Sequence, residues 1–103
     1  MQGTKLKEFP INKISHENIE WHFSQDLILN ITKEENTVFI QNSFLDITVW
    51  GDTVEEAKDA FSFMFYSLYK QILSEQNDKL SQKAILIKER VNSIITEILI
   101  YDK

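Results

Sequence analysis

Residues 38–61 read VFIQNSFLDITVWGDTVEEAKDAF, and this stretch decides the fold class. Its first half holds two β-rich runs with a short polar turn at residues 42–43 between them. In the second run the apolar residues Leu45, Ile47 and Val49 alternate with polar ones, which predicts a strand with one buried face. The second half changes to a helical spacing of apolar residues. The stretch therefore predicts a sheet followed directly by a covering helix.

A capping box marks the start of that helix. Thr53 is followed three residues later by Glu56, a pattern that supplies hydrogen-bond partners to free backbone N–H groups at a helix N-terminus. Gly51, just before it, suits a sharp corner between strand and helix. We predict a sheet-covering helix over residues 52–75. Its single apolar stripe consists of Val54, Ala57, Phe61, Met64, Phe65, Leu68 and Ile72.

The residues before this stretch predict more of the same sheet. Apolar and polar residues alternate over residues 19–23 and again over 27–31, the pattern of two half-buried strands. The charged residues 34–36 are typical of a hairpin connection. The N-terminal stretch matches no single period, and Pro10 confines any strand there to a sheet edge. We therefore expect an antiparallel β-meander over residues 1–51 that begins with an edge strand.

A second helix is expected over residues 80–101, with Ser81 as its N-cap. Its apolar residues recur at alternating spacings of four and three, the heptad pattern of a helix that packs along another helix. Two arrangements fit this pattern: an antiparallel helical hairpin with the first helix, or a seam between two copies of the chain. The heptad positions are Leu80, Ala84, Ile87, Val91, Ile94, Ile98 and Tyr101.

Two aromatic residues of the first helix lie outside its apolar stripe. Phe63 and Tyr66 fall on the opposite side, where solvent-exposed polar residues are expected. Either the second helix or a partner protein must cover them. We predict a homodimer, because the apolar surface exceeds what a solitary monomer normally leaves exposed. The candidate interface residues are Phe63, Tyr66, Ile87, Val91, Ile94 and Ile98.

Together these patterns predict one α+β domain over residues 1–103. An antiparallel β-sheet of three to five strands is covered by a long helix and followed by a second, C-terminal helix. A chain of 103 residues, of which 43% are hydrophobic, can form one hydrophobic core, but two domains would each fall near the lower size limit of a folded domain.

The composition argues against most kinds of catalytic and metal site. No cysteine is present to supply a thiolate, and two glycines placed this way cannot build a phosphate-binding loop. The two histidines, His16 and His22, have neither the companion ligands of a zinc site nor the nucleophile of a catalytic set at an informative spacing. We therefore predict no enzyme activity, no catalytic residues, no metal and no cofactor.

The charge of the chain argues against nucleic acid as a direct partner. The chain has 11 basic and 16 acidic residues, a net charge of −5, and Arg90 is its one arginine. Phosphate binding depends on Lys and Arg, so we expect no direct binding to DNA or RNA. No apolar run reaches the length of a signal peptide or of a membrane-spanning helix. This predicts a cytoplasmic protein that does not contact a membrane.

The turn GDTVEEA, residues 51–57, resembles that of the HicB-like antitoxin domain. In that family a strand meander ends in such a turn, whose threonine, here Thr53, caps a long helix that covers the sheet. The resemblance spans residues 27–61. It implies an acidic protein that acts by binding and masks a basic partner, such as an RNA-cleaving toxin. It transfers no active-site residues, and because the chain is acidic overall and has one arginine, its second helix is not expected to act as the DNA-binding module that often follows in the family.

A second function fits the same residues. A phage or mobile-element protein that inhibits a nucleic-acid-binding defence enzyme of its host would also be small and acidic, and would present carboxylates to the basic channel of that enzyme. Both hypotheses describe a non-enzymatic protein–protein interaction module, and they differ in the partner. A catalytic role would require a site completed by another chain.

Overall fold

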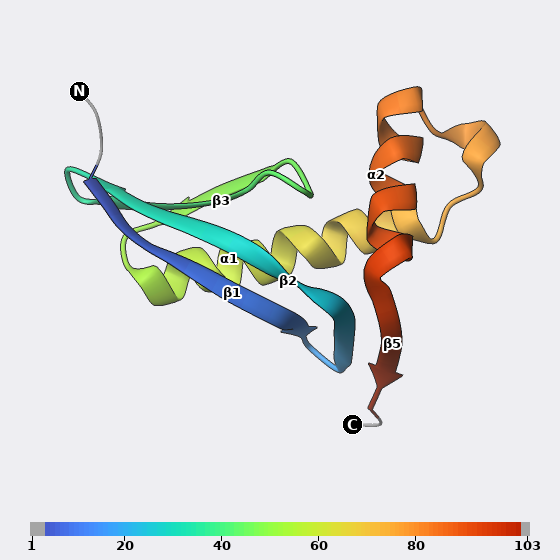
Figure 1. Cartoon of the computed structure of the whole chain (residues 1–103), viewed down its shortest axis with the longest axis horizontal. Coiled ribbons are helices and arrows are strands. Elements are labelled where there is room, and N and C mark those ends of the chain that lie inside the picture. Colours follow the sequence, from blue (N-terminus) through green and yellow to red (C-terminus); the bar gives the residue numbers. More distant parts are fainter. Residues whose placement is uncertain (1–3, 102–103) are drawn as a thin grey trace.

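The computed structural model describes residues 4–101, which form a five-stranded antiparallel sheet and two helices. This architecture confirms the predicted α+β class. Figure 1 shows the longer helix packed against the sheet, with the second helix set crosswise at one end. A π-helical turn over Tyr69–Leu73 extends the longer helix, and a 3₁₀ turn over Asn77–Lys79 precedes the second. The main elements are β1 (Thr4–His16), β2 (Ile19–Glu34), β3 (Thr37–Asn42), β4 (Ile47–Gly51), α1 (Val54–Leu68), α2 (Gln82–Ile94) and β5 (Ile95–Ile100).

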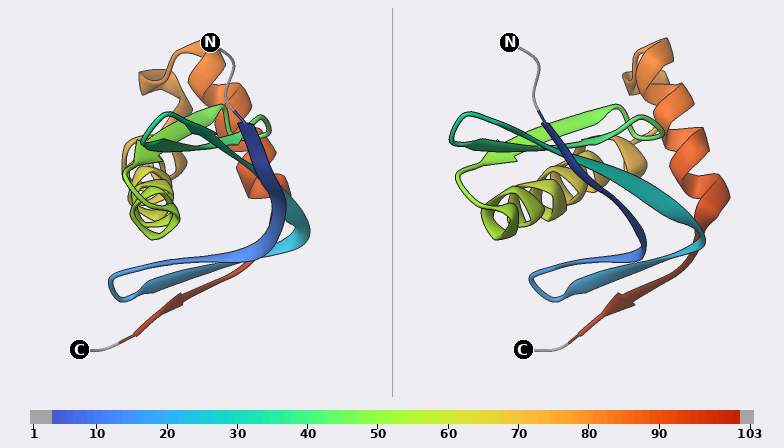
Figure 2. Two further views of the ribbon diagram at one scale, coloured as in Figure 1. Left: turned by 90° about the vertical axis from the view of Figure 1, so that its left-hand side faces the viewer. Right: turned by 60° about the vertical axis from the view of Figure 1, so that its left-hand side comes forward.

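The sheet has the strand order β1-β2-β3-β4, and β5 pairs with the first half of β2. The two strands predicted at residues 19–23 and 27–31 are one long strand, β2. Between these segments the pairing of β2 with β1 slips after Ile11, which adds residues to β2 and bends the sheet. Figure 2 shows the bent sheet curving around α1. β1 is an edge strand, as Pro10 predicts.

Two tight turns set the register of β3 and β4. Glu35, in the predicted hairpin after β2, has a φ of 54°, the left-handed conformation that such turns use. Asn42 is buried at the end of β3: its amide donates to the carbonyl oxygen of Ile28 at 3.0 Å, and its Oδ1 accepts from the backbone N–H of Leu45 at 2.8 Å. These bonds satisfy a buried polar side chain and hold the turn into β4. The alternating apolar residues that follow are buried, as predicted.

α1 begins where the capping box predicts. Thr53 is the N-cap, and its hydroxyl accepts a hydrogen bond from the backbone N–H of Glu56 at 3.1 Å. The Glu56 carboxylate reaches back and accepts from the backbone N–H of Asp52 at 3.2 Å. Glycine is needed at the corner before the cap, because a Cβ at Gly51 would lie 2.8 Å from the backbone nitrogen of Ala57. The junction between β4 and α1 is therefore determined by local chemistry.

Replacing Thr53 by alanine is expected to lower the free energy of unfolding by about 1 kcal/mol, the usual effect of losing a helix N-cap. Thr53→Ser keeps the hydroxyl acceptor and is expected to stay within about 0.5 kcal/mol of the wild type. Urea denaturation of both variants measures the difference. Equal stability of the alanine and serine variants would mean that the cap does not stabilise α1.

The core lies between α1 and the concave face of the sheet. α1 buries Ala57, Phe61 and Phe65, which confirms the centre of the predicted stripe. The Phe65 ring meets two aromatic rings of β2 edge-on, with 5.0 Å between ring centres for Trp21 and 5.7 Å for Phe23. Edge-to-face contacts of this kind add to the stabilisation from apolar burial. The first half of β2 is thereby packed against the C-terminal half of α1.

The prediction of a C-terminal helix over residues 80–101 is wrong in its extent. Ser81 caps α2 as predicted, but α2 ends at Ile94 and the chain continues as strand β5. The reason is an open edge in the sheet: β3 pairs only with the second half of β2, so the first half can accept another strand. The β-branched residues of Ile95–Ile100 suit that place. The heptad spacing therefore continues across an element boundary.

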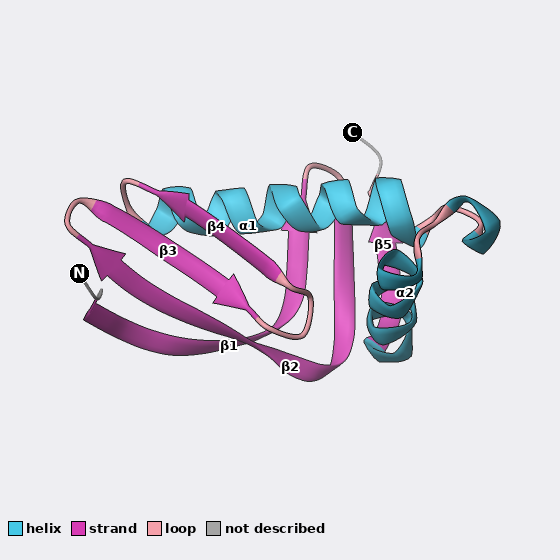
Figure 3. Cartoon of the chain, turned by 90° about the horizontal axis from the view of Figure 1, so that it is seen from above, coloured by secondary structure: helices cyan, strands magenta, loops and turns pink. Residues whose placement is uncertain are grey.

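α2 does not form an antiparallel helical hairpin with α1, which was one of the two arrangements that its heptad pattern allowed. It crosses the π-helical end of α1 and packs against β2, as Figures 1 and 3 show. Val91 and Ile94 are buried there. This arrangement leaves one side of α1 uncovered: Phe63 is 54% exposed, and Met64, which the sequence places in the buried stripe, is 43% exposed.

Candidate interaction site

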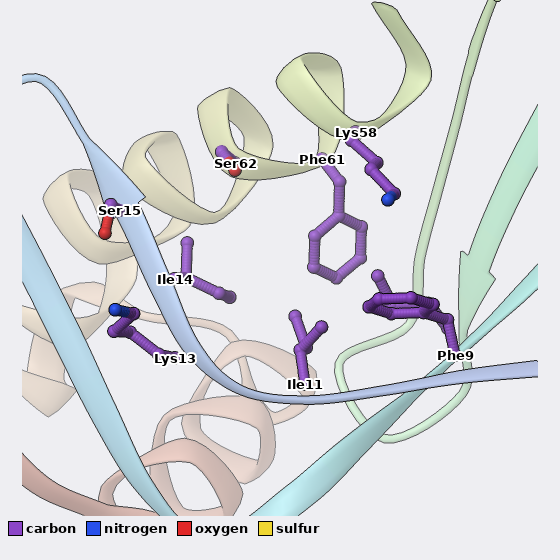
Figure 4. Close-up of a pocket in the computed structure, with 9 residues that line it drawn as sticks. Phe9, Ile11, Lys13, Ile14, Ser15, Lys58, Phe61 and Ser62 are labelled. Carbon is purple, nitrogen blue, oxygen red and sulfur yellow. The ribbon is translucent and has the colours of Figure 1, made fainter. Parts of the chain in front are cut away.

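A small hollow lies between β1 and α1 (Figure 4). Its volume is about 150 Å³, and Phe61 projects into it from α1 toward Ile11. The ammonium group of Lys58 lies 4.5 Å from the centre of the Phe9 ring, a cation–π contact at one side of the hollow. Ligand pockets usually measure about 300–1,000 Å³. We therefore assign this hollow to packing between β1 and α1.

Polar side chains gather around Glu20 where β1, β2 and the end of β5 meet. His22 Nε2 lies 2.7 Å from Glu20 Oε1, and the Ser15 hydroxyl donates to Glu20 Oε2 at 3.2 Å. The Tyr101 hydroxyl donates to Oε1 at 3.4 Å, and the Lys13 ammonium lies 3.9 Å from Oε2. Serine and histidine thus bind the same carboxylate and not each other, so the cluster contains no nucleophile–base pair. Its effect is to join the end of β5 to the β1–β2 hairpin.

The Glu20 cluster favours the ionised carboxylate. The hydrogen bond with His22 holds the pKa of the Glu20 carboxyl below its ordinary value of 4.5, partial burial opposes this, and Ser15 and Lys13 lower the pKa further. Desolvation and the charge of Glu20 raise the pKa of the Tyr101 hydroxyl. Because the pKa of Glu20 is lower in the folded state, its contribution to stability is present above pH 4.5. That contribution is lost as the pH falls through the lowered pKa.

Glu20→Gln is expected to destabilise the protein at neutral pH but not in acid. The difference in unfolding free energy between wild type and variant should be constant well above pH 4.5 and shrink toward zero below it, because the wild-type carboxylate becomes protonated there. Urea denaturation at a series of pH values measures this difference. Glu34→Gln, at the exposed end of β2, is the matched control. A difference that does not change with pH would contradict a stabilising role for ionised Glu20.

The largest apolar side chains left exposed on α1 lie beside an unpaired strand edge. β4 pairs with β3 on one side, and its other edge has no partner strand within residues 4–101. Figure 3 shows α1 crossing behind β4 and continuing past that free edge. Trp50 on β4 is 64% exposed, beside Phe63 and Met64 of α1. We call the free edge of β4 together with Trp50, Phe63 and Met64 the β4 surface.

Two shallow hollows follow the β4 surface and share Met64. The first has a volume of about 320 Å³ and is mostly apolar; it is lined by Thr48, Val49, Trp50, Ala60, Phe63 and Met64. The second, of about 300 Å³, lies between the start of β4 and the C-terminal part of α1. Residues of both β4 and α1 therefore remain accessible along the whole strand.

The N-terminal part of α1 gives the end of this surface a negative charge. Asp52, Glu56 and Asp59 are exposed there, and Glu56 lies one helical turn before Ala60 in the first hollow. Lys58, the basic residue within this segment, turns to the other side of α1 and contacts Phe9. At the opposite end, Asp46 is paired with Lys83 of α2 at 3.0 Å.

The structure separates the candidate interface residues of the C-terminal region. Val91 and Ile94 lie in the core of this chain and not on its surface. Ile87 is half-buried on α2. Ile98 belongs to β5, where it pairs with Trp21 and is 38% exposed. These residues do not form a continuous seam on one helix face.

The two aromatic candidates on α1 have different surroundings. The Tyr66 ring lies 4.7 Å from the His16 ring and 6.4 Å from Trp21, so the tip of the β1–β2 hairpin covers part of it. Phe63 meets His16 edge-on at 5.6 Å and remains largely exposed. Of the two alternatives for their cover, the second helix is therefore ruled out for both residues, and Phe63 is the one that the structure places on the β4 surface.

Sequence reasoning missed Trp50 and Met64 as members of this site. Trp50 alternates with buried Val49, and that spacing places it on the outer face of β4, where it packs on Phe39 with 6.4 Å between ring centres. The alternation of buried and exposed residues along β4 therefore already indicated that Trp50 is exposed. Met64 has no such signal, because its exposure depends on where the sheet ends above α1.

Several kinds of site are absent from the part of the chain that is described. Within residues 4–101, no group of three or more His, Asp or Glu side chains is arranged to hold a metal ion. No helix in that range combines the length and apolar character needed to span a membrane.

Comparison of the chain with protein-family models, curated proteins and solved structures finds no match. Its function has to be inferred from its own residues.

Proposed function

We propose that the protein is a non-enzymatic interaction module that binds a basic protein partner. The β4 surface carries this proposal. Tryptophan, phenylalanine and methionine are enriched in protein interfaces, and here they stand together beside an unpaired strand edge. Natural proteins rarely leave such an edge exposed without a purpose. The acidic residues at the start of α1 and the net charge of −5 favour a partner of opposite charge.

The finer proposal is the role that the HicB-like resemblance implies. The chain would act as an antitoxin that masks the basic surface of a toxin, and would not itself bind nucleic acid. The resembling turn, residues 51–57, adjoins the β4 surface directly, which is consistent with recognition at this part of the fold. The alternative is a phage or mobile-element inhibitor that occupies the nucleic-acid channel of a host defence enzyme. The same acidic balance supports that alternative.

Co-expression with neighbouring genes tests the proposal. Each small basic protein encoded next to this chain is produced alone and together with the full chain, and growth, RNA integrity and complex formation are measured. The antitoxin role predicts that one neighbour arrests growth by cleaving RNA, that the chain restores growth, and that the two proteins co-elute. The alternative predicts that the chain instead displaces nucleic acid from a purified defence enzyme. Failure of all these assays would contradict the proposed function.

Charge variants test why the partner should be basic. Asp52→Asn combined with Asp59→Asn removes two exposed charges beside the β4 surface without changing the two side chains of the capping box, Thr53 and Glu56. Glu34→Gln combined with Glu89→Gln removes the same charge elsewhere and is the matched control. We expect slower association for the first pair only, and an effect that weakens with added salt, because rim charges act mainly on the association rate.

Self-association stays a prediction. The predicted seam residues Val91 and Ile94 are used within the monomer, but Leu86, Ile98 and Ile100 remain exposed near the C-terminal end. Light scattering of the full chain across a concentration series measures the mass. A mass that equals that of a single chain at every concentration would contradict the homodimer.

A further inference from the structure

The two outer edges of the four-strand path are built differently. β1 carries Lys7, Pro10 and Lys13, and its pairing with β2 contains two register shifts. Charged residues, proline and bulges are the usual devices that keep an edge strand from pairing with another chain. β4, with the sequence ITVWG, has no charge and no proline, and its pairing with β3 is regular. β1 is thus protected against an added strand, and β4 is not.

A strand added at the free edge of β4 would lie over the first hollow. Neighbouring strands lie about 4.8 Å apart, so a strand added at the free edge would lie above the part of α1 that continues past β4. The first hollow is in this place, with Ala60, Phe63 and Met64 as its floor. Alternate side chains of the added strand would point down into the hollow. Those on the other face would lie beside Trp50.

We infer that β4 accepts an extended segment of a partner protein as an additional antiparallel or parallel strand. This inference rests on the proposed function and names the form in which the partner is bound. The backbone of the segment pairs with β4, its alternate apolar side chains fill the hollow over α1, and Lys or Arg residues flank it. Strand addition gives affinity through main-chain hydrogen bonds and specificity through the side-chain pockets.

A second copy of this chain does not fit the edge in the same way. Symmetric pairing of two β4 strands would place both α1 helices on the same side of the joined sheet. Because α1 already continues past the free edge, the second α1 would need the space that the first occupies. A single extended segment brings no helix with it. The structure therefore favours a strand from a partner over a β4-to-β4 dimer.

The charge around the edge determines which segment is favoured. β4 itself is uncharged, while Asp52, Glu56 and Asp59 are exposed next to the end of the hollow that Trp50 lines. Basic residues beside an apolar core segment would meet these carboxylates at the rim. A Lys or Arg side chain there can also lie against the exposed Trp50 ring. An acidic segment would be repelled at the same place.

A synthetic peptide tests the inference on the full chain. It has about nine residues, with alternating valine and threonine in the centre and two lysines at each end, long enough to pair along β4. Backbone amide NMR of the labelled protein locates the site, and titration gives the affinity. We expect binding with a Kd below about 1 mM and the largest shifts at Thr48, Val49, Trp50 and around Ala60 and Met64.

Control peptides distinguish strand pairing from nonspecific binding. Two versions carry N-methyl groups on alternate backbone nitrogens, on the odd-numbered residues in one and on the even-numbered residues in the other. Only one of these sets contains the N–H groups that point toward β4, so only that version loses the hydrogen bonds to β4. We expect that version to bind at least about tenfold more weakly, and a version with glutamate flanks to bind more weakly as well. Equal binding of both methylated peptides, or no binding of the parent peptide up to about 1 mM, would overturn the inference.

Two protein variants locate the peptide-binding site. Met64→Lys puts a charge into the hollow and is expected to weaken parent-peptide binding at least about tenfold. Leu86→Lys makes a comparable change at an exposed position of α2 and is expected to have no effect. Shifts that centre on β5, or binding that survives Met64→Lys, would overturn the assignment to β4.

Failure of this inference and failure of the proposed function give different results. If a basic neighbouring protein binds the wild type and Met64→Lys equally well, the interaction module stands and the β4 site is wrong. If the peptide binds at β4 but no basic protein does, strand addition stands and the proposed function is wrong.

Discussion

Replacing Val91 by aspartate is expected to destabilise the protein severely. Val91 has no exposed surface and lies where α2 packs against the rest of the core. The substitution removes the burial of an apolar side chain and places a carboxyl group where it has no water, which together lower stability by roughly 4 kcal/mol or more. Small domains have a total stability of about 5–15 kcal/mol, so this loss would remove most of the stability of a domain at the lower end of that range.

Leu86→Asp is the matched control for Val91→Asp. Leu86 lies five residues earlier in the same helix and is 54% exposed, so its replacement should change stability by less than about 1 kcal/mol. Circular dichroism and urea denaturation measure both variants. A well-folded Val91→Asp protein that has merely become monomeric would contradict the core position of Val91, and would restore the predicted seam between two copies.

Phe65→Ala is expected to lower the free energy of unfolding by about 3–5 kcal/mol, the range for an aromatic side chain removed from a core. The Phe65 ring is fully buried and contacts both Trp21 and Phe23, so the cavity left behind would lie between α1 and the bend of β2. Thermal and urea denaturation measure the loss. A value below about 1 kcal/mol would mean that β2 and α1 collapse around the missing ring.

Phe63→Ala makes the same chemical change two residues away in the same helix. Phe63 is more than half exposed, so the expected destabilisation is below about 1 kcal/mol. A loss as large as that of Phe65→Ala would show that Phe63 is covered in solution, either by self-association or by contacts with the β1–β2 hairpin beyond the single His16 ring contact.

The N-cap of α1 could be predicted to the residue because its signals are local. Thr53 and Glu56 lie within one helical turn of the backbone groups that they bind, so no distant part of the chain is needed to form these hydrogen bonds. The same holds for Ser81, which accepts from the backbone N–H of Ala84 at 3.1 Å. The buried alternation in β4 also follows from a short-range period.

The candidate site could be predicted only in part. Phe63 was recognised because an aromatic residue opposite the apolar stripe of a helix is unusual. Met64 was assigned to the stripe, and its exposure results from the sheet ending at β4 above α1. Val91 and Ile94 were assigned to an interface with the core as the competing interpretation, and apolar spacing on one helix does not tell which neighbour covers it.

The sequence by itself determined the helix caps, the alternating faces of β4, the edge position of β1 and the α+β class, because each depends on neighbours along the chain. Only the tertiary structure decided that residues 19–34 form one bent strand, that the helical spacing after Ile94 becomes β5, and that α1 continues past an unprotected β4. Each of these depends on which distant strand pairs with which edge. Pairing between distant residues leaves no local pattern in the sequence, because the same β-branched residues suit any open edge.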